Sequence, residues 1–178
     1  MFKKIALAFV LVGVVLVGTV LVYATTRPDT LHVQRAAIIN APPDKIAPLI
    51  SDFHRWSAWS PYENIDPALK RNYSGAAGGR GAVYEWQGNM QAGQGRMEIT
   101  EASASRVTIK LDFIKPLEGH NIATFTLVPE GPATKVSWTM DGPSPYIGKV
   151  IGVFINMDTM IGKDFETGLA NLKAVAEK

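Results

Sequence analysis

The feature that most constrains the fold is an alternation of apolar and polar residues with a period of two, which runs through the middle of the chain. It is clearest in residues 106–113, where Val107, Ile109, Leu111 and Phe113 alternate with Arg106, Thr108, Lys110 and Asp112. The same period recurs in residues 82–87, 96–100, 123–127 and 135–140. This period predicts β-strands with one buried and one exposed face.

Short segments rich in turn-forming residues separate these strands. They lie at residues 78–81, 88–89, 115–119 and 130–132, and they contain glycine, proline or asparagine. A parallel pair needs a crossover of about a dozen residues or more, so connections this short favour antiparallel neighbours. Together with a further strand predicted at residues 31–40, the pattern indicates an antiparallel sheet with one apolar face.

The last part of the chain is suited to cover that face. Its apolar residues fall on one broad helical stripe: Phe154, Met157, Met160, Ile161, Phe165, Leu169, Leu172, Val175 and Ala176. A shorter helix is predicted around Ile46 to Phe53, and Pro48 is expected to make it short, kinked or broken. The fold class is therefore α+β, with a long C-terminal helix laid across a curved antiparallel sheet.

The N-terminal segment is uncharged from Ile5 to Tyr23, over nineteen residues. As a helix it would be roughly 28 Å long, close to the hydrocarbon thickness of a bilayer. Lys3 and Lys4 precede it, which favours a cytoplasmic N-terminus. We therefore expect a transmembrane helix at residues 1–24, a linker at 25–30 and a domain at 31–178 outside the cytoplasm, on the periplasmic side if the source is bacterial.

Two other interpretations of this segment stay open. A signal peptide cleaved after Ala24 would also begin with lysines and an apolar run, although such runs usually have about 7 to 15 residues. The second interpretation is that this segment forms a helix buried in the core of the protein. The chain has no cysteine, so neither a lipobox nor a disulfide is possible.

The charge balance argues against nucleic acid as a partner. The whole chain has 18 basic and 16 acidic residues; without Lys3 and Lys4, the part from Arg27 on has 16 of each. It has no basic run, and nucleic-acid-binding domains usually carry a basic patch.

Three stretches of the chain carry a resemblance to a known family. They are INAPPDKIAPLISDFHRWSAWSP from Ile39, GAVYEWQGN from Gly81 and GKDFETGLANLKAV from Gly162. The chain resembles the SRPBCC superfamily, also called START-like or polyketide cyclase/dehydrase and lipid-transport proteins. The resemblance implies a helix-grip fold, in which the sheet wraps around the C-terminal helix and leaves a hydrophobic cavity. Lipid carriers, ligand binders and aromatic cyclases share this fold, so it does not choose among functions.

The strand and helix phases that face inward supply a candidate ligand-binding set of large apolar side chains. The same spacing is typical of a solid core, so the periodicity leaves core and cavity open. The resemblance adds Trp59, because it implies that residues 52–62 pack beside the cavity mouth. The predicted ligand-binding residues are Trp59, Tyr84, Trp86, Met97, Phe125, Trp138, Met157, Met160, Ile161 and Phe165.

Residues able to perform acid–base chemistry are present but not in a recognisable pair. The weak candidates are Asp52, His54 and Tyr62. We do not predict that any of them is catalytic. The three histidines are isolated in the sequence, which predicts no metal site. No glycine-rich phosphate-binding motif is found, and no cofactor is predicted.

These observations predict a membrane-anchored binding or carrier domain for a hydrophobic small molecule or lipid. One alternative is a cyclase/dehydrase-like or hydrolase-like enzyme that uses the same cavity. Another is a protein-interaction domain at the membrane, with the apolar stretch from Tyr146 to Phe154 as its contact surface. A protein partner cannot be named from the sequence.

Overall fold

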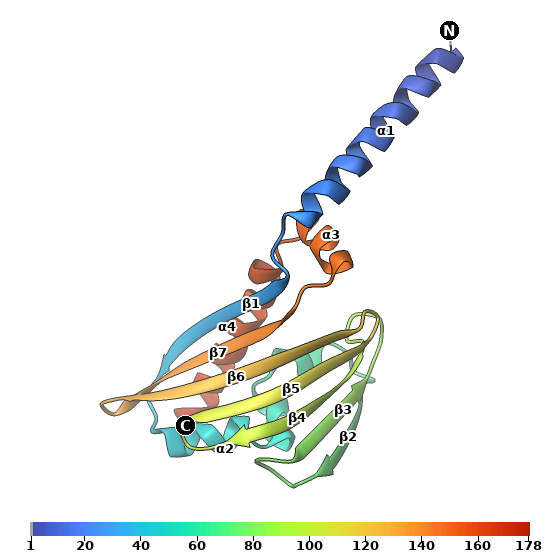
Figure 1. Ribbon diagram of the computed structural model, residues 1–178. Helices are drawn as coiled ribbons and strands as arrows, with labels where there is room; N and C mark the ends of the chain where they lie inside the picture. Colours follow the sequence, from blue (N-terminus) through green and yellow to red (C-terminus); the bar gives the residue numbers. More distant parts are fainter. Residues whose placement is uncertain (1) are drawn as a thin grey trace.

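The computed structural model describes residues 2–178, and it describes the side chains of Ala6 and of the residues from Phe9 on. A seven-stranded antiparallel sheet wraps around a C-terminal helix (Figure 1). The elements in chain order are α1 Phe2–Thr25, β1 Thr30–Ile39, α2 Pro43–Ile50, the 3-10 helices η1 Phe53–Ala58 and η2 Pro61–Asn64, β2 Lys70–Gly75, β3 Ala82–Gln87, β4 Gln94–Ala102, β5 Arg106–Lys115, β6 Gly119–Glu130, β7 Ala133–Pro143, α3 Tyr146–Phe154 and α4 Met157–Ala176.

The sheet has the order β1-β7-β6-β5-β4-β3-β2. Strands β2 to β7 follow one another as hairpins, and β1 completes the sheet by pairing with β7. The buried positions alternate along β5, β6 and β7 as the period of two predicts. The predicted α+β helix-grip fold is therefore confirmed for the sheet and the C-terminal helix, while β2 was not predicted as a separate strand.

The predicted long C-terminal helix is α4, which contains every residue of the apolar stripe except Phe154, and the apolar stretch ahead of it forms a separate helix, α3. Helix α3 ends at Phe154, and α4 begins after Asn156, whose side chain accepts a hydrogen bond of 3.0 Å from the backbone N–H of Thr159. An asparagine in this position is a favourable N-cap, and it starts a new helix within the apolar run. The stretch from Tyr146 to Phe154 is therefore a helix, with its Phe154 side chain 73% exposed.

Helix α4 lies close to the sheet because glycines face it. A β-carbon on Gly162 would collide with the guanidinium of Arg35 on β1, and one on Gly168 would lie 2.7 Å from Cζ3 of Trp138. Arg35 in turn forms ion pairs with Asp158 (3.0 Å) and Glu166 (2.8 Å) on α4. These contacts hold α4 across β1 and β7.

Helix α2 has eight residues and contains Pro48, so it is short as the sequence predicts. The chain then turns into η1, where the side chain of Asp52 accepts a hydrogen bond of 3.0 Å from the backbone N–H of His54. Helices α2 and η1 together cover part of the concave face of the sheet (Figure 1).

The expected transmembrane helix at residues 1–24 is wrong, and so is the expected single-pass placement of the domain outside the cytoplasm. In the part of the chain whose side chains the structure describes, which leaves out residues 2–5, 7 and 8, no helix is long and apolar enough to cross a membrane. The last turn of α1 is engaged by the domain: Ala24 is fully buried, and the Tyr146 hydroxyl donates a hydrogen bond of 2.9 Å to the carbonyl of Leu21.

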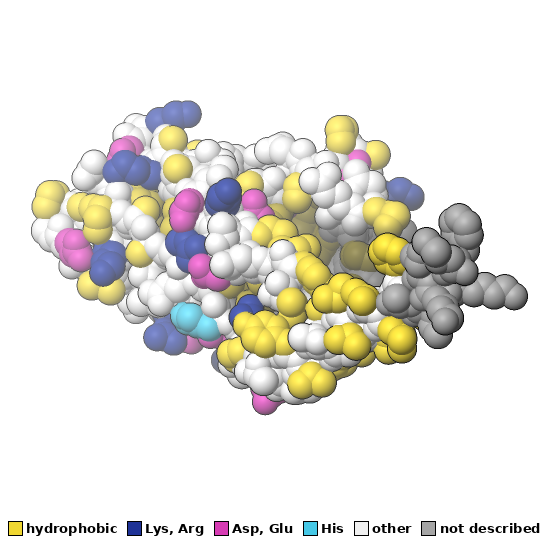
Figure 2. Space-filling view, turned by 90° about the horizontal axis from the view of Figure 1, so that it is seen from above, with side chains coloured by type: hydrophobic (Ala, Val, Ile, Leu, Met, Phe, Trp, Pro, Cys, Tyr) yellow, Lys and Arg dark blue, Asp and Glu magenta, His cyan; other side chains and the backbone are white. Residues whose placement is uncertain are grey.

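Apolar side chains remain exposed along α1 and α3. Examples are Val15 on α1, which is 66% exposed, and Ile147 on α3, which is 55% exposed. Figure 2 shows hydrophobic side chains gathered on the face seen from above, and hydrophobic side chains also line the floor of a hollow in that face.

Candidate functional site

The concave face of the sheet has two parts, which differ in how tightly they are filled. One part, the closed half, is made of Trp59, Phe125, Trp138 and Phe165, all of them at most 3% exposed. The rings of Trp138 and Phe165 stack with centroids 4.0 Å apart, and Phe125 stacks on Trp138 at 4.7 Å. Four of the predicted ligand-binding residues are thus brought together, and they pack against one another.

The two tryptophans of η1 and its C-cap are fixed by hydrogen bonds as well as by packing. The indole N–H of Trp56 donates to the carbonyl of Ile50 (2.8 Å), and that of Trp59 donates to the carbonyl of Leu49 (2.9 Å). These carbonyls lie at the end of α2, where a helix has no partners of its own for them. Both tryptophans therefore hold α2 and η1 together, whatever else Trp59 contacts.

The second part of the concave face, the open half, is made of Trp86 on β3, Phe113 on β5, and Asn121, which lies near the start of β6. Trp86 and Phe113 are half-buried, and their rings meet edge to face at 5.9 Å. Tyr84 and Met97, two further predicted ligand-binding residues, are buried beside them on β3 and β4. The open half therefore borders solvent, whereas the closed half does not.

The predicted ligand-binding residues on α4 differ from one another in exposure. Met157 and Ile161 are half-buried, whereas Met160 is 47% exposed. The apolar stripe of α4 is broad, and its edge lies farther from the sheet than its middle. Met160 lies at that edge, which explains its exposure.

A buried carboxylate that the sequence analysis did not single out ties η2 to the sheet. Glu63 is 5% exposed, and it accepts hydrogen bonds from the hydroxyl of Tyr84 (2.8 Å) and from Nε of Arg71 (2.6 Å). Burial and the neighbouring Glu63 raise the pKa of Tyr84, so this phenol stays protonated and donates. A lone Glu in a loop gives no signal in sequence, because its partners lie on two strands that come later.

Tyr62, a weak catalytic candidate, lies beside Asp164 of α4, a residue missed from the sequence. Burial raises the pKa of Tyr62, with a further contribution from the Asp164 carboxylate, and burial also raises the pKa of Asp164. The Tyr62 ring meets Trp138 edge to face at 6.4 Å. This phenol therefore stays protonated and can donate a hydrogen bond at the edge of the closed half.

The other two weak catalytic candidates lie at the surface. His54 is exposed and stacks on Tyr73 with ring centroids 4.1 Å apart. Asp52 caps η1 and pairs with Arg55 at 3.3 Å. Within the described part of the chain, no group of three or more His, Cys, Asp or Glu residues could hold a metal ion.

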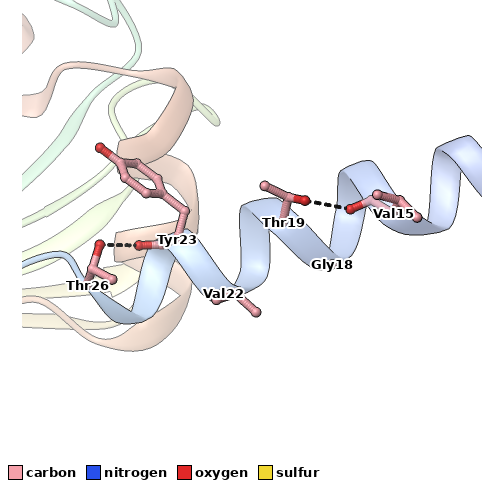
Figure 3. Close-up of a pocket in the computed structure, with 6 residues that line it drawn as sticks. All are labelled: Val15, Gly18, Thr19, Val22, Tyr23 and Thr26. Carbon is pink, nitrogen blue, oxygen red and sulfur yellow. Dashed lines mark hydrogen bonds between the residues drawn. The ribbon is translucent and has the colours of Figure 1, made fainter.

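Two surface hollows lie away from the concave face. One, of about 530 Å³, runs along α1, and the hydroxyls of Thr19 in α1 and of Thr26 just after it donate to carbonyls of α1: Thr19 to Val15 and Thr26 to Tyr23, both at 2.8 Å (Figure 3). The other, of about 320 Å³, lies between α2 and the end of α4 and contains the charged residues Asp44, Lys45, Arg55 and Lys178. Both threonine hydroxyls of the first hollow are thus already engaged with carbonyls of α1.

Comparisons with known proteins agree with this architecture. Protein CV1439 from Chromobacterium violaceum is 18% identical, with 85% of this chain and 99% of that chain covered and a TM-score of 0.58. The Aha1 dimer from Colwellia psychrerythraea is 17% identical (83% and 96% covered, TM-score 0.56), and TTHA0849 from Thermus thermophilus is 18% identical (82% and 97% covered, TM-score 0.56). At these identities the likeness shows the fold alone.

A search of curated proteins found no match. The sequence profile of one family, described as polyketide cyclase / dehydrase and lipid transport, matches residues 30–177. That match covers both halves of the concave face, and it confirms the resemblance that the three sequence stretches indicated. The chain belongs to the polyketide cyclase / dehydrase and lipid transport family.

Proposed function

We propose that this protein binds a hydrophobic small molecule or lipid on the concave face of its sheet, between β3–β7 and α4, and acts as a binding or carrier domain. The observation that carries the proposal is a continuous series of aromatic contacts from the surface to the core. It begins at the half-buried Trp86, passes through Tyr84 at 6.1 Å to Phe53 at 5.8 Å, and reaches Trp56 at 5.3 Å. Trp56 in turn contacts Phe125 of the closed half at 6.3 Å.

An apolar ligand entering along this series would gain about 25 cal/mol for each Å² of apolar surface removed from water. The side chains that must move to admit it include Met97 on β4 and Met140 on β7, which are 8% and 5% exposed. Methionine is unbranched and flexible, so it can repack around ligands of different shape. The family to which the chain belongs includes lipid transport in its description, which supports the same function.

A fluorescence titration with N-phenyl-1-naphthylamine, a neutral hydrophobic probe, tests this proposal on the full chain. We expect a saturable increase in probe fluorescence. The exposed apolar residues of α1 and α3 could also take up the probe, so a pair of variants is needed. Ala123→Leu fills the concave face at a position that is 5% exposed, and Ile122→Leu changes the neighbouring residue of β6, which is 43% exposed on the opposite face.

We expect Ala123→Leu to weaken saturable binding at least fivefold and Ile122→Leu to leave it unchanged. Denaturant unfolding of both variants checks that they remain folded. Equal binding by the two folded variants would place the probe elsewhere and contradict the proposal, and so would the absence of saturable binding in the unaltered protein.

A second candidate function, an enzyme that uses the same face, is favoured by Tyr62 and Asp164. The Tyr62 phenol lies at the edge of the closed half, so it could polarise a carbonyl oxygen of a bound substrate by donating a hydrogen bond, whereas its raised pKa makes it a weaker proton donor. Extraction of the purified protein followed by mass spectrometry would identify a bound molecule. If that molecule is chemically converted by the protein and Tyr62→Phe prevents the conversion without loss of binding, the enzyme is favoured over the carrier.

A further inference from the structure

Asn121 on β6 is a polar residue on the apolar face of the sheet. It is 8% exposed, and it follows the same alternation as the buried Ala123, Phe125 and Leu127. Its partner in the neighbouring strand is Leu111, which is also buried. The amide therefore points to the concave side, in the open half of the face.

The amide of Asn121 has no hydrogen-bond partner among the residues described. Three other polar side chains on this face are satisfied: Arg35 pairs with Asp158 and Glu166, Thr134 donates to the carbonyl of Ala41 (2.7 Å), and Tyr84 donates to Glu63 (2.8 Å). Among the described residues, the fully enclosed side-chain atoms without a partner are Oγ of Ser60 and the indole nitrogen of Trp138, so the amide atoms of Asn121 still reach solvent. Buried polar groups are normally paired, and this amide can take its hydrogen bonds from water or from a ligand.

The backbone leaves room for this amide. Gly142 on β7 lies against it, and a β-carbon at that position would collide with Oδ1 of Asn121. Phe113 lies on the neighbouring strand, close to Gly119 at the start of β6. The amide is thus set between two strands, with an aromatic ring of the open half nearby.

A second unpartnered group lies deeper on the same face. Within the part of the chain that the structure describes, the indole nitrogen of Trp138 is buried without a hydrogen-bond partner. Asn121 lies against Gly142, and Gly142 and Trp138 are four residues apart on β7. At roughly 3.4 Å for each residue, the Asn121 amide and the Trp138 indole are anchored about 13 Å apart along the strand direction. Ala123 and Met140, which face each other across β6 and β7, lie between them. Both groups are uncharged, and an indole N–H can only donate.

We propose that Asn121 is the polar anchor of the ligand site, and that the ligand is an uncharged molecule with an apolar body and a hydrogen-bond acceptor such as a carbonyl oxygen. This inference rests on the proposed function, because it assigns the class of ligand for the same face. The apolar body lies over Ala123 and Met140, and the acceptor receives a hydrogen bond from the Asn121 amide. A carboxylate is disfavoured, because neither unpartnered group carries a positive charge to balance it.

Three probes of similar size test this inference with the full chain: 2-acetylnaphthalene, which has a carbonyl oxygen, 2-ethylnaphthalene, which has none, and 2-naphthoate, which is charged. Binding is followed by quenching of tryptophan fluorescence. We expect the ketone to bind about 3- to 10-fold more tightly than the hydrocarbon, the ratio that one net hydrogen bond provides. The carboxylate is expected to bind most weakly.

The variant Asn121→Leu has nearly the same shape and no amide, and Asn64→Leu on the exposed part of η2 is its control. We expect the preference for the ketone to disappear in Asn121→Leu, with binding of the hydrocarbon retained, and to persist in Asn64→Leu. If the ketone and the hydrocarbon bind equally well to the unaltered protein, the anchor is wrong while the proposed function stands. If none of the three probes binds, both are wrong.

An NMR measurement on the unaltered protein keeps the inference testable if Asn121→Leu does not fold. The side-chain amide signals of Asn121 are expected to shift on addition of 2-acetylnaphthalene and to move less with 2-ethylnaphthalene. Unchanged Asn121 signals at saturating ketone would overturn the assignment.

Discussion

The closed and open halves of the concave face use the same kinds of residue, yet they differ in burial: the four aromatic residues of the closed half are at most 3% exposed, whereas Trp86 and Phe113 of the open half are half-buried. Each half also holds one polar group without a partner in the described chain. In and around the closed half, the indoles of Trp56 and Trp59 donate to carbonyls of α2, whereas the indole of Trp138 has no partner among the described residues. In the open half, the amide of Asn121 likewise lacks a partner within the described chain, and it lies beside rings that border solvent. The difference indicates that the closed half serves mainly stability, and that the open half is the place where a ligand first binds.

The largest expected effect is on the closed half. Trp138→Ala would remove the ring that stacks on both Phe125 and Phe165 and would leave a cavity, so we expect a loss of about 3–5 kcal/mol in the free energy of unfolding. Urea denaturation measures it, with Ile122→Ala on the outer face as the control. A loss below about 1 kcal/mol would show that this half is not the stabilising core.

The buried ion pair of Glu63 provides the next effect. Arg71→Met would leave the Glu63 carboxylate buried with Tyr84 as its remaining side-chain donor, and we expect a loss of about 2–4 kcal/mol in the free energy of unfolding. Combining it with Glu63→Leu should recover part of that loss, because no buried charge remains. A double variant less stable than the sum of the two single changes would contradict this explanation.

The close approach of α4 to the closed half predicts a smaller loss. In Gly168→Ala the new methyl group would lie 2.7 Å from the Trp138 ring and 3.2 Å from Cδ of Pro61, and overpacking of this kind costs about 1–3 kcal/mol. Gly152→Ala is the matched control, since it also lies in a helix and its β-carbon would meet no described atom within 4 Å. Thermal unfolding compares the stability of the two variants, Gly168→Ala and Gly152→Ala. Equal midpoint temperatures would argue against tight packing at Gly168.

In the open half a substitution is expected to stabilise the protein slightly. Asn121→Leu would replace an unpartnered buried amide by an apolar group of similar shape, so we expect a gain of about 0–1 kcal/mol in the free energy of unfolding. Urea denaturation measures this change too. A loss of about 2 kcal/mol or more would mean that the amide has a structural partner, and Asn121 would then belong with Glu63 and not with a ligand.

The outer face of the sheet gives the smallest effect. Asp112, which lies 2.7 Å from Nδ1 of His120, raises the pKa of this histidine, and the same contact helps to lower the pKa of Asp112. Because the folded pKa of His120 is raised, its stabilisation is present below the unfolded value of about 6.5 and is lost as the pH rises through the folded pKa. An NMR titration should show the pKa of His120 returning toward 6.5 in Asp112→Asn; an unchanged pKa would contradict the pairing.

Much of the fold could be predicted from the sequence because it depends on local periodicity. The alternation in residues 106–113 fixes which face of β5 is buried, and the short turns fix the antiparallel order. The stretch from Tyr146 to Phe154 was not predicted to be helical, and Phe154 was assigned to the stripe of the next helix, because Asn156 does not interrupt the apolar spacing. The membrane helix was predicted from a count of uncharged residues, and among the described residues no helix is long and apolar enough to cross a membrane.

The candidate site was less accessible from the sequence than the fold. Three aromatic residues of the closed half, Phe125, Trp138 and Phe165, could be identified because each follows a strand or helix period, whereas Trp59 was added by the family resemblance. Glu63, Asp164 and Asn121 could not, because their importance depends on whether partners from distant strands or helices satisfy them. Asn121 differs from its neighbours on β6 only by being polar on the apolar phase, which is the one signal that the sequence offers.

The most direct test of the central claim, that a hydrophobic ligand binds on the concave face, is to map 2-acetylnaphthalene binding by NMR on the full chain. We predict that the signals of Asn121, Met140 and the Trp138 indole shift together and saturate at one ligand per protein, while Ile122 on the outer face does not move. Shifts confined to the exposed apolar residues of α1 and α3, or no saturable shifts on β6 and β7, would contradict the claim.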